Sequence, residues 1–177
     1  MHERVAPVFG IAPQAIRAGG TLRVTARADY AVRAALELAG GFGSGRAMRG
    51  EAIAKAQGIS PKFLETILAE LRHCGIVNSQ RGVDGGYWLA RPPEEISIAD
   101  VIRAVEGPLA RVHSSPPEDL VYEGAAAALP TVWVAVRRAV RDVVEHATLA
   151  DVAAGNLPPE IRELAADPEA WRTREGA

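Results

Sequence analysis

The sequence predicts a mainly α-helical protein, a winged helix-turn-helix followed by a long C-terminal dimerisation helix. Apolar residues recur at helical spacing between Pro61 and Leu71, and a glycine turn then separates two short runs typical of strands. Farther along, a narrow apolar stripe marks a helix expected from Pro130 to about Ala147. A chain of 177 residues fits one domain, or a small domain with an appended dimerisation element.

Two helices are expected before the recognition helix. The first runs from Thr25 to Gly40, and its apolar face is made of Tyr30, Ala31, Ala34 and Leu38. The second covers roughly Arg49 to Gln57, with Ala52, Ile53 and Ala56 facing inward. Gly58 then makes the tight turn that a helix-turn-helix needs before its third helix.

The third helix is the candidate recognition helix. Ser60 is a good N-cap, and Pro61 suits the first helical position because its missing N–H has no partner there in any case. Gly75 fits the C-terminal end. The apolar stripe consists of Phe63, Leu64, Ile67, Leu68 and Leu71. The polar residues off this stripe are therefore free to meet a ligand.

A small β-ribbon, the wing, is expected directly after this helix. Asp84-Gly85-Gly86 is a hairpin signal between the runs Ile76–Arg81 and Tyr87–Ala90. A helix with a polar face followed by a ribbon that carries an arginine is the layout of a winged helix-turn-helix. The chemistry expected of it is recognition of DNA.

The C-terminal half begins with a capped helix from Ser97 to about Glu106. The 108–128 loop holds three prolines and few large apolar residues, and the long helix that follows it carries the stripe Trp133, Val136, Val140 and Val143/Val144. A short helical turn begins at Thr148, and the acidic chain after Gly155 is expected to fray. The domain boundaries expected are therefore 1–21 (leader or mis-assigned start), 22–92 (winged helix-turn-helix), 93–155 (dimerisation helices and loop) and 156–177 (tail).

The charge is divided along the chain. Residues 22–92 hold ten Lys/Arg and six Asp/Glu, a net charge of +4, whereas residues 93–177 hold eight and fifteen, a net charge of −7. This division is expected if only the first half meets phosphate, although chance could also produce it. The single cysteine excludes an internal disulfide and indicates a reducing compartment. With no membrane-length apolar run and a poor signal peptide, we expect a cytoplasmic protein that binds no membrane.

Seven segments carry a resemblance to a known family: LRVT (22–25), DYAVR (29–33), ISPKFLE (59–65), LR (71–72), GIV (75–77), RG (81–82) and GGYWLARP (85–92). They are similar to the Rrf2 family of bacterial transcription regulators over roughly residues 22–152. Family members usually start at the position of Leu22, so the first 21 residues are either an extension or an upstream start codon wrongly chosen. The resemblance implies a homodimer held by the long helix; the alternative is that its stripe packs on the protein's own winged helix.

The candidate DNA-binding residues on the recognition helix are Ser60, Lys62, Glu65 and Thr66. Ser60 can donate to phosphate, and Lys62 can reach phosphate or a guanine edge. Glu65 matches a base-reading position of the family and can accept from cytosine N4, or it is simply a solvated residue.

The candidate DNA-binding residues on the wing are Arg81, Gly82 and Gly85, with Gly86 beside them. Arg81 matches the family's minor-groove arginine, and its alternative is an ordinary pair with Asp84. The glycines would let the backbone approach phosphates. Three arginines are weaker phosphate candidates: Arg23, Arg27 and Arg49.

The resemblance also implies an iron–sulfur cluster in many members, held by three cysteines in the 108–128 loop, but this loop has none. Asp29 matches an acidic cluster ligand of one branch and here is expected to cap or pair locally. His113 could join Glu118, Asp119 and Glu123 around a metal, or these residues are only solvated. We therefore predict no cofactor and no metal.

Cys74 looks like a small buried side chain at the end of the recognition helix, with a thiol switch as the alternative. We expect no enzyme, because no nucleophile or acid–base constellation stands out. The function predicted is a sequence-specific regulator, a dimeric repressor on a palindromic operator in double-stranded DNA. The alternatives are a winged-helix module that binds protein, or a regulator switched through Cys74. A small-molecule or protein effector near Trp133 stays open.

Overall fold

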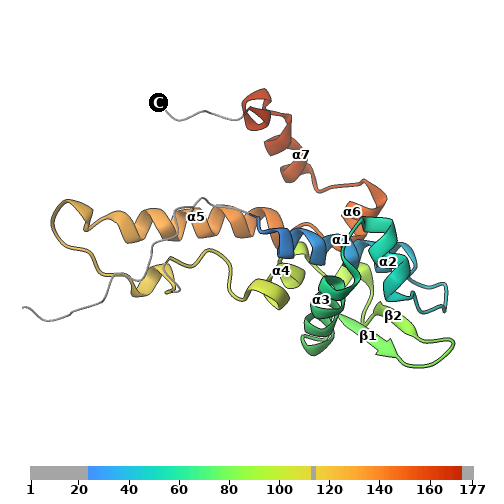
Figure 1. The fold of residues 1–177 in the computed structure, drawn as a ribbon. Helices are drawn as coiled ribbons and strands as arrows, with labels where there is room; N and C mark the ends of the chain where they lie inside the picture. Colours follow the sequence, from blue (N-terminus) through green and yellow to red (C-terminus); the bar gives the residue numbers. More distant parts are fainter. Residues whose placement is uncertain (1–23, 113–114, 173–177) are drawn as a thin grey trace, which may run out of the picture.

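The computed structural model describes residues 24–112 and 115–172, so the expected leader lies outside the described part. The described chain is mainly helical, with one two-stranded antiparallel sheet. Helices and sheet gather into one body, from which the long helix α5 (Leu129–Val144) and the tail helix α7 (Pro159–Ala166) project (Figure 1). The predicted class, a mainly α winged helix-turn-helix, is confirmed.

Helix α1 (Ala26–Gly40) is the centre of the body. The Thr25 hydroxyl caps it by accepting a hydrogen bond from the N–H of Ala28 at 3.0 Å. Its buried residues are nearly all small: Ala28, Ala31, Ala34, Ala35 and Leu38. Because alanines keep the helix surface flat, α2, α3, α4, α6 and the sheet all pack around it.

The helix-turn-helix is formed by α2 (Gly50–Gln57) and α3 (Pro61–His73). Gly58 adopts the left-handed conformation, with φ of 63°, and lets the chain turn sharply between them. Ile53 and Ala54 of α2 are buried, whereas Ala52 and Ala56 are exposed, so the predicted inward face of this helix is wrong except at Ile53. Relative to the predicted orientation, helix α2 is turned about its axis so that Ala54 packs into the core.

The wing consists of β1 (Val77–Gln80) and β2 (Gly86–Leu89), paired antiparallel with Val77 opposite Leu89. The turn between them runs from Gly82 to Gly85, whose N–H donates to the Gly82 carbonyl at 3.0 Å. Met48 adds a bridge to Tyr87 on the outer side of β2, with hydrogen bonds of 2.8 and 2.9 Å. The wing is therefore anchored both to α3 and to the segment before α2.

The C-terminal half returns to this core. Helix α4 (Ile98–Glu106) begins with a capping box between Ser97 and Asp100, as predicted. After α5, the chain forms α6 (Leu149–Ala154), and Leu149 is fully buried in the core. The Ile98 N–H donates to the Ala147 carbonyl at 2.8 Å, which joins the start of α4 to the end of the α5 segment.

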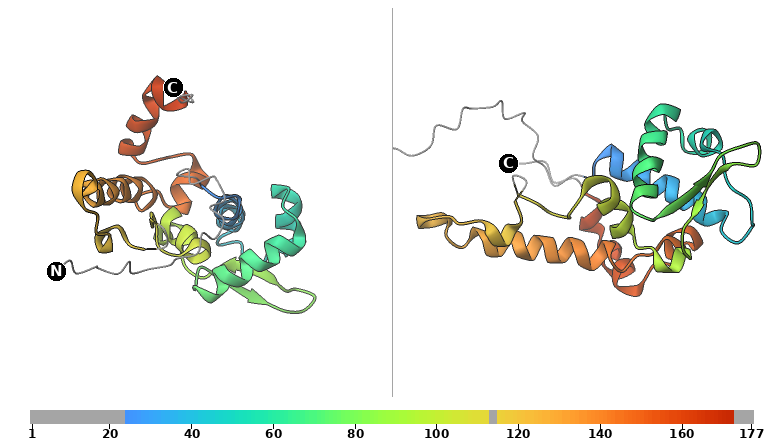
Figure 2. Two further views of the ribbon diagram at one scale, coloured as in Figure 1. Left: turned by 60° about the vertical axis from the view of Figure 1, so that its left-hand side comes forward. Right: turned by 90° about the horizontal axis from the view of Figure 1, so that it is seen from below.

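The 108–128 loop runs beside α5 and contains two short 3₁₀ turns, η2 (Pro117–Asp119) and η3 (Gly124–Ala126). Figures 1 and 2 show α5 extending out of the body with this segment alongside it. No residue of α5 is fully buried. Among the described helices, none has the length and apolar character needed to cross a membrane.

The expectation that the chain after Gly155 frays is wrong for the described residues 156–172. This segment forms α7 (Pro159–Ala166) and the 3₁₀ turn η4 (Pro168–Trp171), which pack against each other. Proline at the first turn supports helix formation in each case because it has no N–H to leave unpaired.

Candidate nucleic-acid interface

The recognition helix α3 presents its predicted residues to solvent. Lys62, Glu65 and Thr66 are exposed, while Leu64, Ile67, Leu68 and Leu71 of the same helix are buried. Phe63 was expected in the apolar stripe, but it is 38% exposed and packs edge-on against the Tyr30 ring. Neither Lys62 nor Glu65 uses its side chain in a hydrogen bond or ion pair within residues 24–112 and 115–172. Both are therefore free for an external partner.

Ser60 lies at the N-cap of α3, as predicted, but its side chain makes no capping hydrogen bond. Its hydroxyl is exposed. The first-turn N–H groups of α3 consequently have no side-chain acceptor, and these groups attract anions because they carry the positive end of the helix dipole. Ser60 and the first turn of α3 form one polar patch with Lys62.

Arg81 lies at the end of β1, where the wing turn begins, and it is exposed. The alternative pair with Asp84 is absent, and the guanidinium has no other partner in the described chain. Gly82, with φ of 112°, is also exposed. The wing thus offers an unpaired cation next to open backbone.

Gly85 and Gly86 are required by the fold of the wing, apart from any contact with DNA. A Cβ added to Gly85 would collide with the Gln80 carbonyl across the turn, and one added to Gly86 would lie 2.6 Å from the Met48 carbonyl oxygen. Close approach of backbone to backbone, which only glycine allows, shapes the wing. Their approach to phosphate stays a prediction.

An open groove of about 810 Å³ separates the wing from the start of α2 and the end of α3. Three arginines line it, Arg49, Arg72 and Arg81. Arg72 donates to the Ser79 hydroxyl at 3.2 Å, and Arg49 donates to the Val83 carbonyl at 2.7 Å. These hydrogen bonds hold the two guanidinium groups against the wing and leave further N–H groups for phosphate.

Sequence reasoning gave Arg72 no role in this interface. The signal was present, because Arg72 follows Glu65 by seven residues, and two helical turns return to the same face. Arg49 was only a weak phosphate candidate, yet its bond to the wing turn makes it a residue that positions the wing. The structure therefore gathers its cations in the groove, beside the patch on α3.

Arg27, another phosphate candidate, is engaged elsewhere. Its guanidinium forms an ion pair with Glu70 of α3, and both side chains are about one-third exposed. The hydrogen bond with Glu70 raises the pKa of Arg27, burial opposes that rise, and the charges of Glu70 and Glu106 add to it. Arg27 thus ties α1 to the recognition helix. Arg23 lies outside the described residues.

Cys74 is exposed, so the prediction of a small buried side chain is wrong. It caps the C-terminal end of α3, and its Sγ lies 3.8 Å from the Ala104 carbonyl oxygen of α4. The apolar stripe ends at Leu71, and Gly75, with φ of 70°, turns the chain away, which leaves the thiol at the rim of the core. Asp29 pairs with Arg33 at 3.3 Å, which agrees with the expected local pairing.

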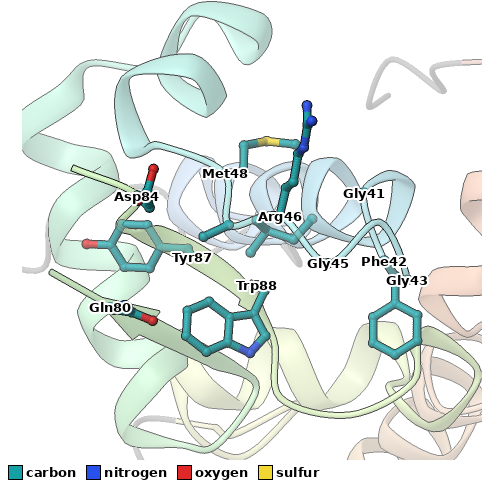
Figure 3. Close-up of a pocket in the computed structure, with 12 residues that line it drawn as sticks. Gly41, Phe42, Gly43, Gly45, Arg46, Met48, Gln80, Asp84, Tyr87 and Trp88 are labelled. Atoms are coloured by element: carbon teal, nitrogen blue, oxygen red, sulfur yellow. The ribbon is translucent and has the colours of Figure 1, made fainter. Parts of the chain in front are cut away.

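A second hollow, of about 480 Å³, lies on the outer face of the wing. Figure 3 shows its walls, where Trp88 and Phe42 face the space from the wing and from the glycine-rich loop after α1. The Arg46 side chain extends away from both rings. The hollow offers apolar surface without a converging charged group, so we assign no ligand to it.

The 108–128 loop is held to α5 by an ion pair between Glu118 and Arg137 at 2.6 Å. A backbone hydrogen bond at Glu118 and the Arg137 guanidinium hold the pKa of the Glu118 carboxyl below its usual value. No group of three His, Cys, Asp or Glu residues in the described ranges is placed to hold a metal ion. His113 lies outside those ranges, so the metal alternative around it stays a prediction.

Comparison with known proteins gives one consistent result. The profile of the Rrf2 family, described as an iron-dependent transcriptional regulator, matches residues 24–155. A putative HTH-type transcriptional regulator of Mycobacterium tuberculosis, Rv1287, is 50% identical over 157 residues, which cover 88% of this chain and 97% of that protein. The HTH-type transcriptional regulator CymR of Bacillus subtilis is 34% identical over 132 residues, covering 75% of this chain and 90% of CymR.

Solved structures agree with these sequence matches. The structure of CymR, the global cysteine regulator of B. subtilis, has a TM-score of 0.65 at 30% identity and covers 76% of this chain and 98% of its own. The structure of T. potens IscR has a TM-score of 0.59 at 32% identity and covers 86% and 93%, respectively.

Proposed function

The chain belongs to the Rrf2 family of transcriptional regulators, and from this premise we propose that it is a dimeric repressor on a palindromic operator, without control by an iron–sulfur cluster. Membership makes it a DNA-binding transcriptional regulator of the helix-turn-helix type, and its relatives are regulators and not enzymes. We propose three properties beyond family membership: that the chain forms a dimer, that it represses transcription, and that no iron–sulfur cluster controls it.

One observation supports the dimer, a seam along α5 that the described residues leave partly exposed. Its residues follow at intervals of four, three and four, the heptad spacing at which one helix meets another: Val132, Val136, Ala139 and Val143. Val132 is 51% exposed and Ala139 is exposed, while the two other valines are half-buried. Two copies of a seam made of valine and alanine can approach closely and bury it.

The neighbouring face of α5 has a different partner. Arg137 lies one turn beyond Trp133 on this face, and its ion pair with Glu118 joins the face to the chain's own loop. Trp133 is half-buried there. The Trp133 flank of the predicted stripe therefore lies beside the chain's own 108–128 loop and not on the winged helix, and we infer that the Val136 flank contacts a second copy.

A dimer explains how a small interface becomes specific. One recognition helix contacts only a few base pairs, whereas two helices related by a two-fold axis read two half-sites about one helical turn apart. In this arrangement Lys62 and Glu65 lie at base edges, Arg81 enters the minor groove, and Arg49 and Arg72 contact phosphate. Repression requires only that the bound dimer occupies a promoter.

Iron is implied by the family's description, and the residues of this chain do not fit an iron–sulfur cluster. Such clusters are held by several cysteine thiolates, and the whole sequence has one cysteine. That cysteine, Cys74, lies at the C-terminal end of α3, beside the Ala104 carbonyl. The 108–128 loop is instead fastened by buried Pro117 and by Glu118.

The test combines binding with oligomeric state. The purified chain should elute as a dimer in light scattering and should protect an inverted repeat in its own promoter, with an affinity that falls steeply as salt rises. A reporter gene under that promoter should be more active when the regulator is deleted. A protein-binding module would show no salt-dependent affinity for DNA, and lower reporter activity on deletion would indicate an activator.

The variant Ala139→Glu tests whether the seam is the dimer interface. A carboxylate there would be desolvated between two helices, so the dimer should dissociate and operator affinity should fall, while the exposed position keeps the monomer folded. Ala153→Glu, on the exposed surface of α6, is the matched control. A dimer that survives Ala139→Glu unchanged would contradict the seam as the interface.

A further inference from the structure

The tail formed by α7 and η4, here called the arm (residues 157–172), has apolar side chains without cover. Leu164 is 61% exposed and Trp171 is 79% exposed. The Trp171 indole N–H donates to the Ala165 carbonyl at 2.7 Å, which fixes η4 against α7. An ordered helix that keeps large apolar groups in water is a surface for association.

We propose that the arm docks on α5 of a second copy of the chain, on the face that carries Val134 and Arg138. This inference rests on the proposed dimer and adds a second contact to it, separate from the seam. Three features favour a second copy as the partner: the direction of the arm, the charges on the two surfaces and the faces of α5 that remain open.

The direction of the arm is set at its base. The Asn156 N–H donates to the Asp151 carbonyl at 2.9 Å and closes α6, and Pro158 and Pro159 then restrict the backbone that enters α7. Figure 1 and the left view of Figure 2 show α7 standing clear of α1–α5. The arm therefore reaches outward, and residues 24–112 and 115–156 of its own chain leave Leu164 and Trp171 exposed.

The arm's open surface is acidic around an apolar centre. Glu160, Glu163 and Asp167 surround Leu164 in a shallow depression of about 500 Å³. Glu160 and Glu163 form no salt bridge within the described ranges. A matching surface would present an apolar residue beside an exposed cation.

The matching surface exists on α5. Val134 is 39% exposed, and Arg138 follows it at four residues, which places both on one side of the helix. Arg141, at the edge of this side, is half-buried and pairs with Glu145 at 3.7 Å. Arg138 has a side chain that is 76% exposed, and its one ion pair with a described residue is to Asp142, one turn away. An exposed pair of this kind is weak, so the arginine can exchange partners at little cost.

This face is also the part of α5 that has no other assignment. The Trp133 and Arg137 face holds the chain's own loop, and the seam through Val136 holds the second helix. By helical spacing the Val134 face lies on the side of α5 away from the seam, so pairing along the seam would leave it open to the arm of the second copy. Each subunit would then clasp the other, and two arms would flank the helix pair.

Photo-crosslinking tests the contact directly. A benzoylphenylalanine placed at position 164 of the full chain should, on irradiation, give a covalent dimer whose linked peptide lies within Leu129–Val144. Mixing isotope-labelled and unlabelled chains shows whether the link joins two copies. Links within one chain, or links of the second copy to another element, would overturn the proposal.

Dimer affinity gives the second test. Leu164→Glu should raise the dimer dissociation constant about tenfold or more, because it removes one buried leucine per arm. Val83→Glu, on the exposed wing tip, is the control in the absence of DNA. An unchanged dissociation constant for Leu164→Glu would refute the arm contact while the seam dimer stands. A monomeric wild-type chain would overturn the dimer, and the arm contact with it.

Discussion

Arg81→Ala is the substitution that most directly tests how the wing binds DNA. Because the guanidinium has no partner in the described protein, its removal should change the free energy of unfolding by no more than about 0.5 kcal/mol. Each dimer loses two cations at the DNA surface. The slope of log K against log salt should therefore become shallower by about 1.8, since each neutralised phosphate contributes about 0.9.

The assay is fluorescence anisotropy with a labelled operator fragment between 50 and 200 mM salt. Over that fourfold range, a slope difference of about 1.8 makes the affinity deficit of the variant shrink roughly tenfold. Arg46→Ala is the matched control, because Arg46 is exposed beside the hollow at Trp88 and not in the groove that Arg81 lines, and its removal costs the same charge. Arg81→Lys should restore the slope but not the preference for a narrow minor groove. If Arg81→Ala and Arg46→Ala behave alike, Arg81 does not bind DNA.

Three further predictions concern readout, acidity and redox state. Glu65→Ala should relax base preference in a randomised operator library by about 1–3 kcal/mol at one position and leave non-specific binding intact; unchanged selectivity would contradict it. The Glu118–Arg137 contact should persist above the ordinary pKa of a glutamate and be lost as pH falls through the lowered pKa of Glu118, and Glu118→Gln should abolish this dependence. The loss of this contact would be followed by tryptophan fluorescence in a variant whose only tryptophan is Trp133. Cys74→Ser should leave the response of DNA binding to peroxide unchanged, because a single thiol per chain cannot close a disulfide within the subunit; a response lost in the variant would establish a thiol switch through a sulfenic acid or a disulfide between subunits.

Local signals in the sequence were enough to predict most elements. Ser97 and Asp100 form the predicted capping box, and Gly58 and Gly75 adopt the left-handed conformations expected where helices end. Each of these features depends on residues within a few positions of one another. The helices and the wing follow from them because the same positions also carry the apolar periodicity.

What the sequence could not predict depends on contacts between distant segments. Arg27 meets Glu70 across 43 positions, so its diversion from phosphate is visible only in the fold. Cys74 was expected to be buried because its neighbours in sequence are apolar, but the helix ends at the rim of the core. In α2, eight residues are too few to fix which side faces inward, and Ala54 was missed.

On α3 the candidate DNA-reading side chains and the side chains that hold the fold lie on different faces, and this affects how the regulator can change its target. The side chains of Lys62 and Glu65 form no hydrogen bond or ion pair with another described residue, whereas the opposite side of the helix is held by buried Leu68 and by the ion pair of Glu70 with Arg27. The reading surface can therefore be rewritten one side chain at a time without disturbing the scaffold beneath it. A lineage that duplicates this gene could acquire a new operator by a few substitutions, and an engineer could transplant the reading residues of a relative onto the same backbone.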